Sequence, residues 1–391
     1  MSAPRLEIRL DLIEANTRSI VDQLAPLGIA VSGVTKAALG SPEVARALLR
    51  GGVAGLADSR VENIERMRAS GINCEILLIR SPMLSQVSRV VQAADASCNS
   101  ELSVMTALSE EAVRQHKRHG VLLMVELGDL REGVLANDLL RMIEKTQALA
   151  GIKLIGIGTN LACQNGVIPD QAKMTELSSL ALEVELNTSK TLRLVSGGNS
   201  ANLTWALGAG AGIGRVNHLR LGEALLLGTD PLSGTVFPGL RNGAFALFGE
   251  VIESKVKPSR PWGARGRTPF DTATTECPMN PRCDTRNAML VALGHQDTNP
   301  HGIAPPPGQI VIGASSDHLV MEALDSLPQV GSEVQFELSY SALLSSMTSP
   351  FVSKKYVASC GPAHHLDEMI GTAVSKVRPS IRDSRFLAAF Q

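Results

Sequence analysis

The chain has 391 residues, of which 44% are apolar and 19% are charged, with 37 basic and 38 acidic side chains. This length leaves room for two domains, because a single hydrophobic core rarely grows far beyond ~250 to 300 residues. The balanced charge offers no basic surface that would attract nucleic acid or anionic lipid. Aromatic residues make up only 3%, so base stacking lacks material as well. We therefore expect no nucleic-acid partner.

The N-terminal segment carries Arg5, Glu7 and Arg9 where a secretory signal would need an apolar stretch. No run in the sequence approaches the ~20 apolar residues of a membrane span. We expect a cytoplasmic protein that does not enter a membrane. The six cysteines are scattered, and only Cys277 and Cys283 are close together. Their spacing matches neither a zinc site nor a disulfide framework, so no metal is predicted.

Short β-rich segments alternate with longer helical patterns as far as Gly228, which is typical of repeated βα units. Helices are predicted at 42–50, 61–69, 100–119, 138–149 and 170–186. Eight strands are predicted at 28–35, 55–58, 75–79, 94–98, 121–127, 153–159, 192–196 and 217–221. Eight such units predict an α/β fold, a (β/α)8 TIM-type barrel over residues 1–230.

After Gly228 the pattern changes to strands without long helices between them. We predict a second, β-rich domain over residues 231–391, which the first strand of the chain can also join. Its strands are predicted at 244–256, 288–294, 309–313, 318–323, 333–339 and 354–358. Residues 257–286 are rich in Pro, Gly, Arg and Thr and predict a long loop. A helix is predicted at 366–377 in the C-terminal tail.

Cationic residues follow several predicted barrel strands, at the end where TIM-type barrels carry their active sites. Lys36 follows the apolar run 29–35, and Arg80, Arg131 and Arg220 follow or end other strands. A lysine sheltered among other cations is suited to form a Schiff base. The alternative is a surface lysine at a strand end that is polar only because it meets solvent.

Two segments near the last barrel strands are suited to hold a phosphate group. Residues 196–200, Ser-Gly-Gly-Asn-Ser, offer hydroxyl and backbone N–H donors before a predicted helix. Residues 220–224 lie at the eighth strand, and barrels of this kind frequently bind phosphate after strands seven and eight. Together with Lys36, these segments predict pyridoxal 5'-phosphate, attached covalently at one end and held through its phosphate at the other.

Taken together, the motifs resemble the ornithine racemase branch of the alanine racemase family, which are fold type III pyridoxal phosphate enzymes. The resemblance runs in order from residue 6 to residue 352, and the combination is specific although each motif alone is not. The motifs are Gly-Val-Thr-Lys at 33–36, Leu-Ala-Asp-Ser-Arg at 56–60, Gly-Asp-Leu-Arg-Glu-Gly at 128–133, Gly-Ile-Gly-Thr-Asn-Leu at 156–161, Ser-Gly-Gly-Asn-Ser at 196–200, Leu-Arg-Leu-Gly-Glu-Ala at 219–224 and Gly-Ala-Ser-Ser-Asp-His at 313–318.

The resemblance implies roles for individual residues. Lys36 would hold the cofactor and then act as one of two acid–base groups at the substrate α-carbon. Arg220 would donate a hydrogen bond to the pyridine nitrogen and keep it largely unprotonated, which discourages transamination. Arg131 would bind the substrate carboxylate through its planar fork. The remaining cofactor-binding residues would be Asn160, Ser196, Gly198, Ser200, Gly222 and Glu223, the last two through backbone amides at the phosphate.

The sequence also departs from the alanine racemase pattern. Met124 stands where those enzymes place a modified lysine, and Asn160 stands where they place an imidazole. The run Lys-Ala-Ala-Leu-Gly at 36–40 lacks the tyrosine that binds phosphate in those enzymes. These differences argue against an ordinary alanine racemase.

The second acid–base residue differs most. Alanine racemases donate a tyrosine from the partner subunit within Gly-Tyr-Ala-Asp, whereas residues 294–297 here are Gly-His-Gln-Asp. We favour His295, because histidine has a pKa closest to the working range for moving a proton. The alternative is that His295 is an ordinary solvated loop residue. The other polar candidates are Asp297, Asp317, His318 and Tyr340.

The sequence therefore predicts a homodimeric amino acid racemase whose active site is completed by the partner's β-rich domain. The family branch points to a basic substrate such as ornithine or lysine, which requires a carboxylate near the mouth of the barrel. Glu101, Asp297 and Asp317 are candidates, and Asp317 is assigned to the substrate site. Two alternatives stay open: a lyase or decarboxylase that uses the same cofactor, and a non-catalytic pyridoxal phosphate carrier.

Overall fold

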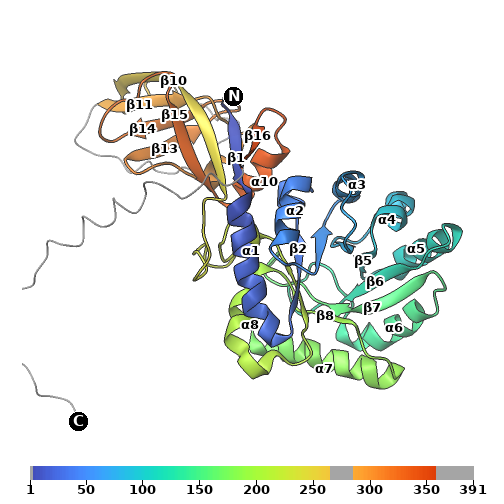
Figure 1. The fold of residues 1–391 in the computed structure, drawn as a ribbon. Helices are drawn as coiled ribbons and strands as arrows, with labels where there is room; N and C mark the ends of the chain where they lie inside the picture. Colours follow the sequence, from blue (N-terminus) through green and yellow to red (C-terminus); the bar gives the residue numbers. More distant parts are fainter. Residues whose placement is uncertain (1–2, 265–284, 358–391) are drawn as a thin grey trace, which may run out of the picture. The chain divides into compact units, whose positions relative to one another are not determined.

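A parallel β-barrel organises the first part of the chain. The computed structural model describes residues 3–264 and 285–357, and within them eight strands close into a barrel in sequence order (Figure 1). They are β2 (Ala30–Val34), β3 (Gly55–Asp58), β4 (Ile76–Leu78), β5 (Ala96–Asn99), β6 (His119–Met124), β7 (Ile152–Gly158), β8 (Leu194–Ser196) and β9 (His218–Leu221). All six residues of β6 are buried, as expected when helices cover the outside of a parallel sheet and side chains fill its inside.

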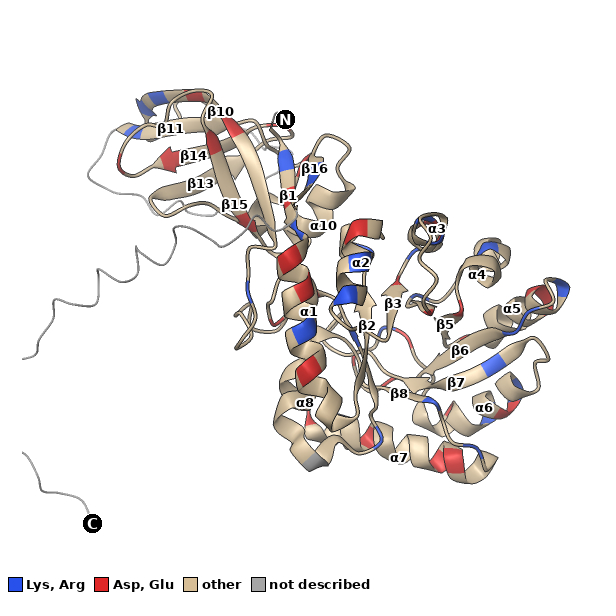
Figure 2. Cartoon of the chain, viewed as in Figure 1, with Lys and Arg blue, Asp and Glu red and all other residues tan. Residues whose placement is uncertain are grey.

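Helices connect the barrel strands and carry charged residues along their length, as Figure 2 shows for α1 and α7. Local signals set their ends: Ser41 accepts a hydrogen bond from the Val44 N–H at 3.3 Å, and Pro42 occupies the first turn of its helix. None of the described helices is long and apolar enough to cross a bilayer. They are α1 (Leu10–Leu24), α2 (Pro42–Arg50), α3 (Val61–Ala69), α4 (Val87–Ala93), α5 (Leu102–Arg114), α6 (Leu139–Gln147), α7 (Gln171–Thr188), α8 (Leu203–Ala209) and α9 (Glu223–Leu226).

The predicted barrel is confirmed, and each predicted strand overlaps one of β2 to β9. The helix predicted at 100–119 is too long, because α5 ends at Arg114, His116 has a φ of 55° and His119 begins β6. Residues 115–119 contain neither Gly nor Pro, so the sequence carries neither of these helix-ending signals at this boundary. The helix expected after residues 196–200 is α8. Helices α1, α4 and α9 were not predicted; α1 starts after Arg9 without a side-chain cap, and the other two have only seven and four residues.

The remaining strands form a mostly antiparallel sheet, with eight strands in the described part of the chain. They are β1 (Arg5–Arg9), β10 (Phe245–Pro258), β11 (Thr285–Val291), β12 (Ile303–Ala304), β13 (Gln309–Ala314), β14 (Leu319–Ala323), β15 (Glu333–Leu338) and β16 (Ser353–Val357). Helix α10 (Tyr340–Thr348) follows β15. Strand β1 precedes the barrel in sequence, yet it pairs with β10 on one side and β16 on the other.

The six strands predicted after Gly228 correspond to β10, β11 and β13 to β16. The predicted loop at 257–286 is wrong at its edges, because Lys257 pairs with Arg286 in the β10–β11 ladder. Residues 265–284, which include Cys277 and Cys283, lie outside the described residues, as does the helix predicted at 366–377. Helix α10 was not predicted, because its serine-rich sequence favours turns over helix.

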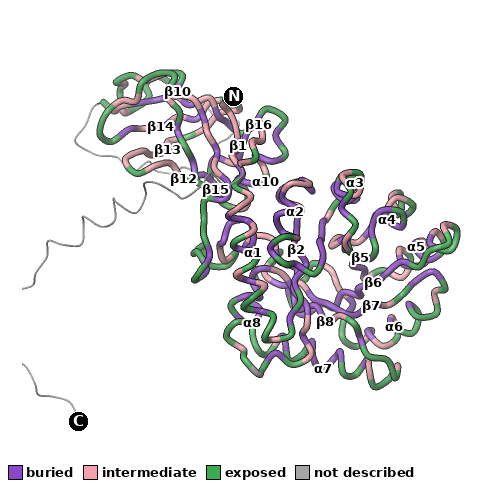
Figure 3. Tube along the Cα trace, viewed as in Figure 1, coloured by how far each residue is buried: buried purple, intermediate pink, exposed green. Residues whose placement is uncertain are grey.

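Side chains fill the inside of the barrel. Figure 3 shows the barrel strands as largely buried. The interior cluster contains Val34, Ala57, Leu77, Ala96, Cys98, Leu122, Met124 and Ile155. Because these side chains close the middle of the barrel, a ligand can approach only from the ends of the strands.

Gly156 in β7 faces β8 with no room for a side chain. A Cβ at Gly156 would lie 1.8 Å from the backbone oxygen of Leu194, its partner across the strand pair. We expect Gly156→Ala to lower the free energy of unfolding by about 3 kcal/mol, because the two strands must move apart. Gly313→Ala in β13 is the control, since nothing lies within 4 Å of a Cβ there. Urea unfolding measures both variants, and equal loss of stability would contradict the packing argument.

Candidate active site at the mouth of the barrel

A cavity of about 710 Å³ opens where the barrel strands end. Its size is typical of a small-molecule site, and TIM-type barrels bind their substrates at this end. The lining combines residues that follow or end barrel strands with one residue of α10. The polar and charged residues include Lys36, Arg80, Ser81, Arg131, Glu132, Asn160, Ser200, Arg220, Glu223 and Tyr340.

Lys36 follows β2 directly, in a short 3₁₀ turn. The buried Thr35 before it donates its hydroxyl hydrogen to Asp58 Oδ2 at 2.6 Å, which ties the end of β2 to the end of β3. Asp58 also accepts a hydrogen bond from Asn63 Nδ2 at 2.9 Å. Burial raises the pKa of Asp58, and these donors act against that rise. The backbone from which Lys36 reaches the cavity is therefore fixed.

Tyr340, the first residue of α10, lies beside Lys36 in the cavity. The Lys36 Nζ is 5.9 Å from the centre of the Tyr340 ring, within the range of a cation–π contact. Burial raises the pKa of the Tyr340 phenol, and the negative charge of Glu223 adds to the rise. The sequence offered Tyr340 only as a candidate acid–base residue, because nothing in it predicted that α10 meets the turn after β2.

Arg220 is buried at the base of the cavity and hydrogen-bonded on two sides. Its Nη2 donates to the Thr159 backbone oxygen at 2.6 Å, and its Nη1 donates to Ser196 Oγ. A buried guanidinium needs such acceptors, because a desolvated charge without partners is costly. Ser196, predicted to contact the cofactor, therefore acts here as a partner of Arg220.

The hydrogen-bonded chain continues behind Arg220 through His218. Ser196 Oγ lies 2.9 Å from His218 Nδ1, and His218 Nε2 lies 2.9 Å from Ser32 Oγ. Burial lowers the pKa of His218 to about 3, so this imidazole is neutral. A neutral imidazole has one N–H donor and one acceptor nitrogen, so His218 donates to one of these two serine hydroxyls and accepts from the other. No role was predicted for His218, because a histidine within a strand resembles ordinary core.

The Ser200 side chain is hydrogen-bonded to the backbone of the segment after β9. Its hydroxyl oxygen accepts hydrogen bonds from the N–H groups of Gly222 and Ala224, each at 3.2 Å. The sequence predicted an anion site from Ser200 with the amides of Gly222 and Glu223. The structure brings these residues together and adds the Ala224 amide.

Two polar groups in the lining have no hydrogen-bond partner among the described residues. They are Asn160 Nδ2 and Ser81 Oγ, both buried. Asn160 is oriented through its oxygen, which accepts from Asn199 Nδ2 at 3.2 Å. Gly198, just before Asn199, has a φ of 144°, a conformation that favours glycine. Buried polar groups are normally paired, so these atoms are suited to a bound ligand.

Arg131 and Glu132 form a two-pronged ion pair inside the cavity. Arg131 Nε and Nη2 donate to the two carboxylate oxygens of Glu132. This hydrogen bonding raises the pKa of Arg131 above its usual value. The sequence predicted that Arg131 binds a carboxylate, and its fork already holds one from the neighbouring residue. No role was predicted for Glu132 from the sequence, although its position next to Arg131 could have indicated an ion pair between the two side chains.

Asp129 fixes the loop that carries this ion pair. Its buried carboxylate accepts backbone N–H groups of four residues in the loop after β7, at 2.9 to 3.3 Å. Burial acts to raise the pKa of Asp129, but the four donors hold it below its usual value. The carboxylate thus joins the loop of Arg131 to the loop that follows Asn160.

His295 and Asp317 do not line this cavity in the same chain. Burial lowers the pKa of His295, and Asp317 Oδ1 lies 2.9 Å from His318 Nδ1. The other two predicted carboxylates are also elsewhere: Glu101 is exposed before α5, and Asp297 accepts a backbone N–H at 2.8 Å. The predicted site residues therefore fall into a barrel group, which meets at the cavity, and a sheet group, which does not.

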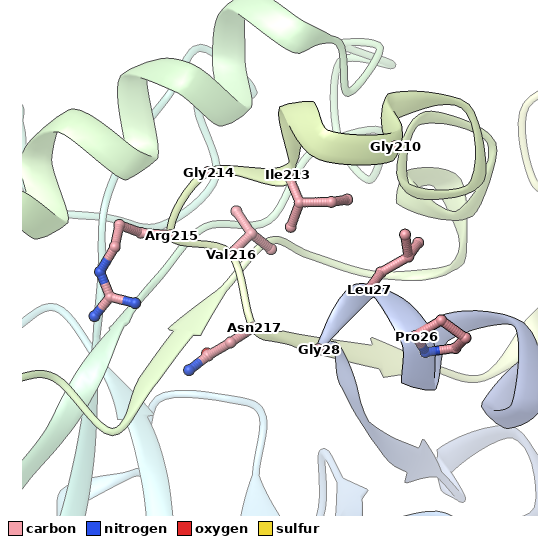
Figure 4. A pocket seen from close by; sticks show the side chains of 9 residues that line it. All are labelled: Pro26, Leu27, Gly28, Gly210, Ile213, Gly214, Arg215, Val216 and Asn217. Carbon is pink, nitrogen blue, oxygen red and sulfur yellow. The ribbon is translucent and has the colours of Figure 1, made fainter.

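A second cavity, of about 450 Å³, lies at the opposite end of the barrel, before β2 and β9 (Figure 4). Its charged lining residue, Arg215, is ion-paired with Glu185. Its other lining residues are Pro26, Leu27, Gly28, Gly210, Ile213, Gly214, Val216 and Asn217. In the described ranges, no group of three or more His, Cys, Asp and Glu residues could hold a metal ion. The polar and charged residues suited to catalysis or ligand binding are thus concentrated in the first cavity, at the mouth of the barrel.

Comparisons with known proteins agree with this geometry. Residues 8–230 match the family model of the alanine racemase N-terminal domain. The lysine racemase of Thermotoga maritima is 36% identical over 358 residues, which cover 91% of this chain and 99% of that protein. The ornithine racemase of Acetoanaerobium sticklandii is 33% identical over 356 residues, covering 90% and 99%.

The fold also matches a solved structure. The alanine racemase of Clostridium difficile 630 superposes with a TM-score of 0.70, covering 92% of this chain and 97% of that one. The two sequences are only 20% identical, so this likeness concerns the fold.

We expect Asp129→Asn to lower the free energy of unfolding by about 2 kcal/mol at neutral pH, because four backbone donors lose a charged acceptor. The pKa of Asp129 is lowered in the folded state, so its stabilisation is present above the ordinary Asp pKa of about 4. It disappears as the pH falls through the lower folded value. Urea unfolding from pH 7 to pH 3 measures the difference between variant and wild type.

The control is Asp138→Asn, since Asp138 pairs with Arg141 on the surface. A gap between Asp129→Asn and wild type that widens as the pH falls would contradict the proposed role of the carboxylate.

Proposed function

The chain belongs to the alanine racemase family, and on that premise we propose that it is a pyridoxal phosphate-dependent racemase of a basic amino acid, such as ornithine or lysine. The observation that carries the proposal is the convergence of Lys36, Arg131, Ser200 and Arg220 on one cavity. The names of the two curated relatives support a basic substrate.

The cavity fits pyridoxal phosphate chemically. Lys36 supplies the amine for covalent attachment, and Arg220 supplies a donor for the pyridine nitrogen. Ser200 and the backbone N–H groups after β9 suit the phosphate, and the unpaired Asn160 Nδ2 suits a further cofactor oxygen. When bound, the cofactor would withdraw electrons from the substrate α-carbon and so make the α-proton acidic.

The chain's own residues then bind the substrate and move the proton. Arg131 would bind the α-carboxylate through its Nη1 donors, because its Nε and Nη2 are engaged by Glu132. Lys36 removes or returns the α-proton on one face of the α-carbon. Arg220 cannot readily give up its proton, so it would leave the pyridine nitrogen of a bound cofactor largely unprotonated and so limit side reactions. A second acid–base group must work on the opposite face for the configuration to invert.

We propose that this second group is His295 from a second copy of the chain, in a homodimer. Apolar side chains around the mouth of the barrel support such a partner: Leu130 is 74% exposed, Ile168 63% and Leu84 60%. Each lies in a segment that follows a barrel strand, at the end of the barrel that carries the cavity, and exposed apolar side chains there favour a protein partner. Asp317 would reach the cavity in the same way.

Proton NMR in deuterated water tests the activity. We expect the cofactor-loaded protein to exchange the α-proton of L-ornithine or L-lysine, with the D-enantiomer appearing. Lys36→Ala should lower this rate at least about 1,000-fold and abolish capture of the cofactor by borohydride reduction. The control is Lys255→Ala, because the Lys255 side chain is 65% exposed.

Other outcomes of the NMR experiment would overturn the proposal. Loss of the carboxylate or the side chain would identify a decarboxylase or lyase. Cofactor capture without exchange of any amino acid in a full panel of both enantiomers would identify a carrier. Capture of the cofactor by Lys36→Ala would contradict the assignment of the attachment site.

A mixture of two inactive variants tests the shared active site. If His295 acts in the partner's cavity, mixed dimers of Lys36→Ala and His295→Ala contain one intact site. Refolding the two variants together in equal amounts should then restore about one quarter of wild-type activity. Each variant refolded alone is the control. Unchanged racemisation by His295→Ala alone, or no recovery in the mixture, would contradict the assignment.

A further inference from the structure

The cavity contains two carboxylates in very different settings. Glu132 is neutralised by the fork of Arg131, with both oxygens engaged. Glu223 forms no ion pair within the described part of the chain, and its contact there is a hydrogen bond from the Thr229 hydroxyl at 3.3 Å. Of the two carboxylates in the cavity, Glu223 is therefore the one that no side-chain cation of the described residues pairs with directly.

The setting of Glu223 makes this charge costly. Its side chain is half-buried, and burial raises its pKa, with Asp230 adding to the rise. The positive charge of Lys36 acts in the opposite direction. Lys36 is committed to the cofactor in the proposed function, so it cannot be a permanent counter-ion. A half-buried carboxylate without a cation costs free energy that a bound cation would recover.

Glu223 lines the same cavity as Tyr340 and Lys36. Its charge acts on the phenol of Tyr340, and the Tyr340 ring centre lies 5.9 Å from Lys36 Nζ. Lys36 is the group that would work at the substrate α-carbon. The distal ammonium of ornithine or lysine is separated from the α-carbon by a few methylene groups, so both ends of the substrate fit within one cavity of about 710 Å³.

We propose that the Glu223 carboxylate binds the distal ammonium of a basic amino acid and thereby determines the substrate class. This inference rests on the proposed function and deepens it. A neutral amino acid would leave the charge of Glu223 without a partner, so it would be rejected by loss of an interaction rather than by size. The sequence assigned this task to Asp317, which lies outside the cavity beside His318.

Glu223→Gln tests the proposal, because glutamine keeps an oxygen for the Thr229 hydroxyl and the same backbone. We expect the ratio of kcat/KM for L-lysine to kcat/KM for L-norleucine to fall about 100-fold, chiefly through KM for lysine. The matched control is Glu132→Gln in the same cavity. It should weaken both substrates alike, since Glu132 engages Arg131, and should leave the ratio unchanged.

Glu223→Asp gives a signature that a merely structural role would not produce. Aspartate retracts the carboxylate by one methylene group, so the longer substrate should be favoured. We expect the ratio of kcat/KM for L-lysine to that for L-ornithine to rise in Glu223→Asp relative to wild type. This variant retains the charge, and it also serves if Glu223→Gln fails to fold.

Binding without turnover separates this inference from the proposed function. Wild type should bind ε-aminocaproate more tightly than caproate in isothermal titration, and Glu223→Gln should lose the difference. If racemisation is absent but this difference is present and depends on Glu223, the proposed function fails and the ammonium site stands. An unchanged lysine-to-norleucine ratio in Glu223→Gln, or a loss of that ratio in Asp317→Asn instead, would overturn the inference.

Discussion

The buried guanidinium of Arg220 imposes the main constraint on the mouth of the barrel. A charge removed from water must be met by acceptors, and here they come from the ends of β7 and β8. Ser196 also forms a hydrogen bond with His218, which in turn forms one with Ser32 in β2. The cation is therefore anchored in a hydrogen-bonded chain across four strands, and that chain keeps the guanidinium at the cavity.

The two carboxylates of the cavity are held differently. Glu132 is matched by its neighbour Arg131, and the loop that carries both is held by Asp129 through four backbone donors. Glu223 instead has a hydroxyl as its described partner. A basic amino acid carries both a carboxylate and an extra ammonium. A carboxylate without a cationic partner, such as Glu223, gives specificity for that ligand, because the ammonium can pair with it.

The sequence predicts the barrel because its signals are local. Parallel strands buried on both faces appear as short apolar runs, and residues at their ends converge by geometry, so Lys36, Ser200 and Arg220 could be grouped without a structure. The parts that were missed depend on tertiary contacts. Tyr340 reaches Lys36 only because α10 packs against the turn after β2, and His218 gains its role only from neighbours on other strands.

Strand β1 gives the fold an unusual order of assembly. Its two partners, β10 and β16, are encoded after the entire barrel, and β16 lies at the far end of the described chain. During synthesis, β1, with the apolar side chains of Leu6 and Ile8, has no strand partner until β10 has been made, and its other edge stays unpaired until β16 follows. A chain that stops before Ser353 therefore leaves the β16 side of β1 as an open sheet edge.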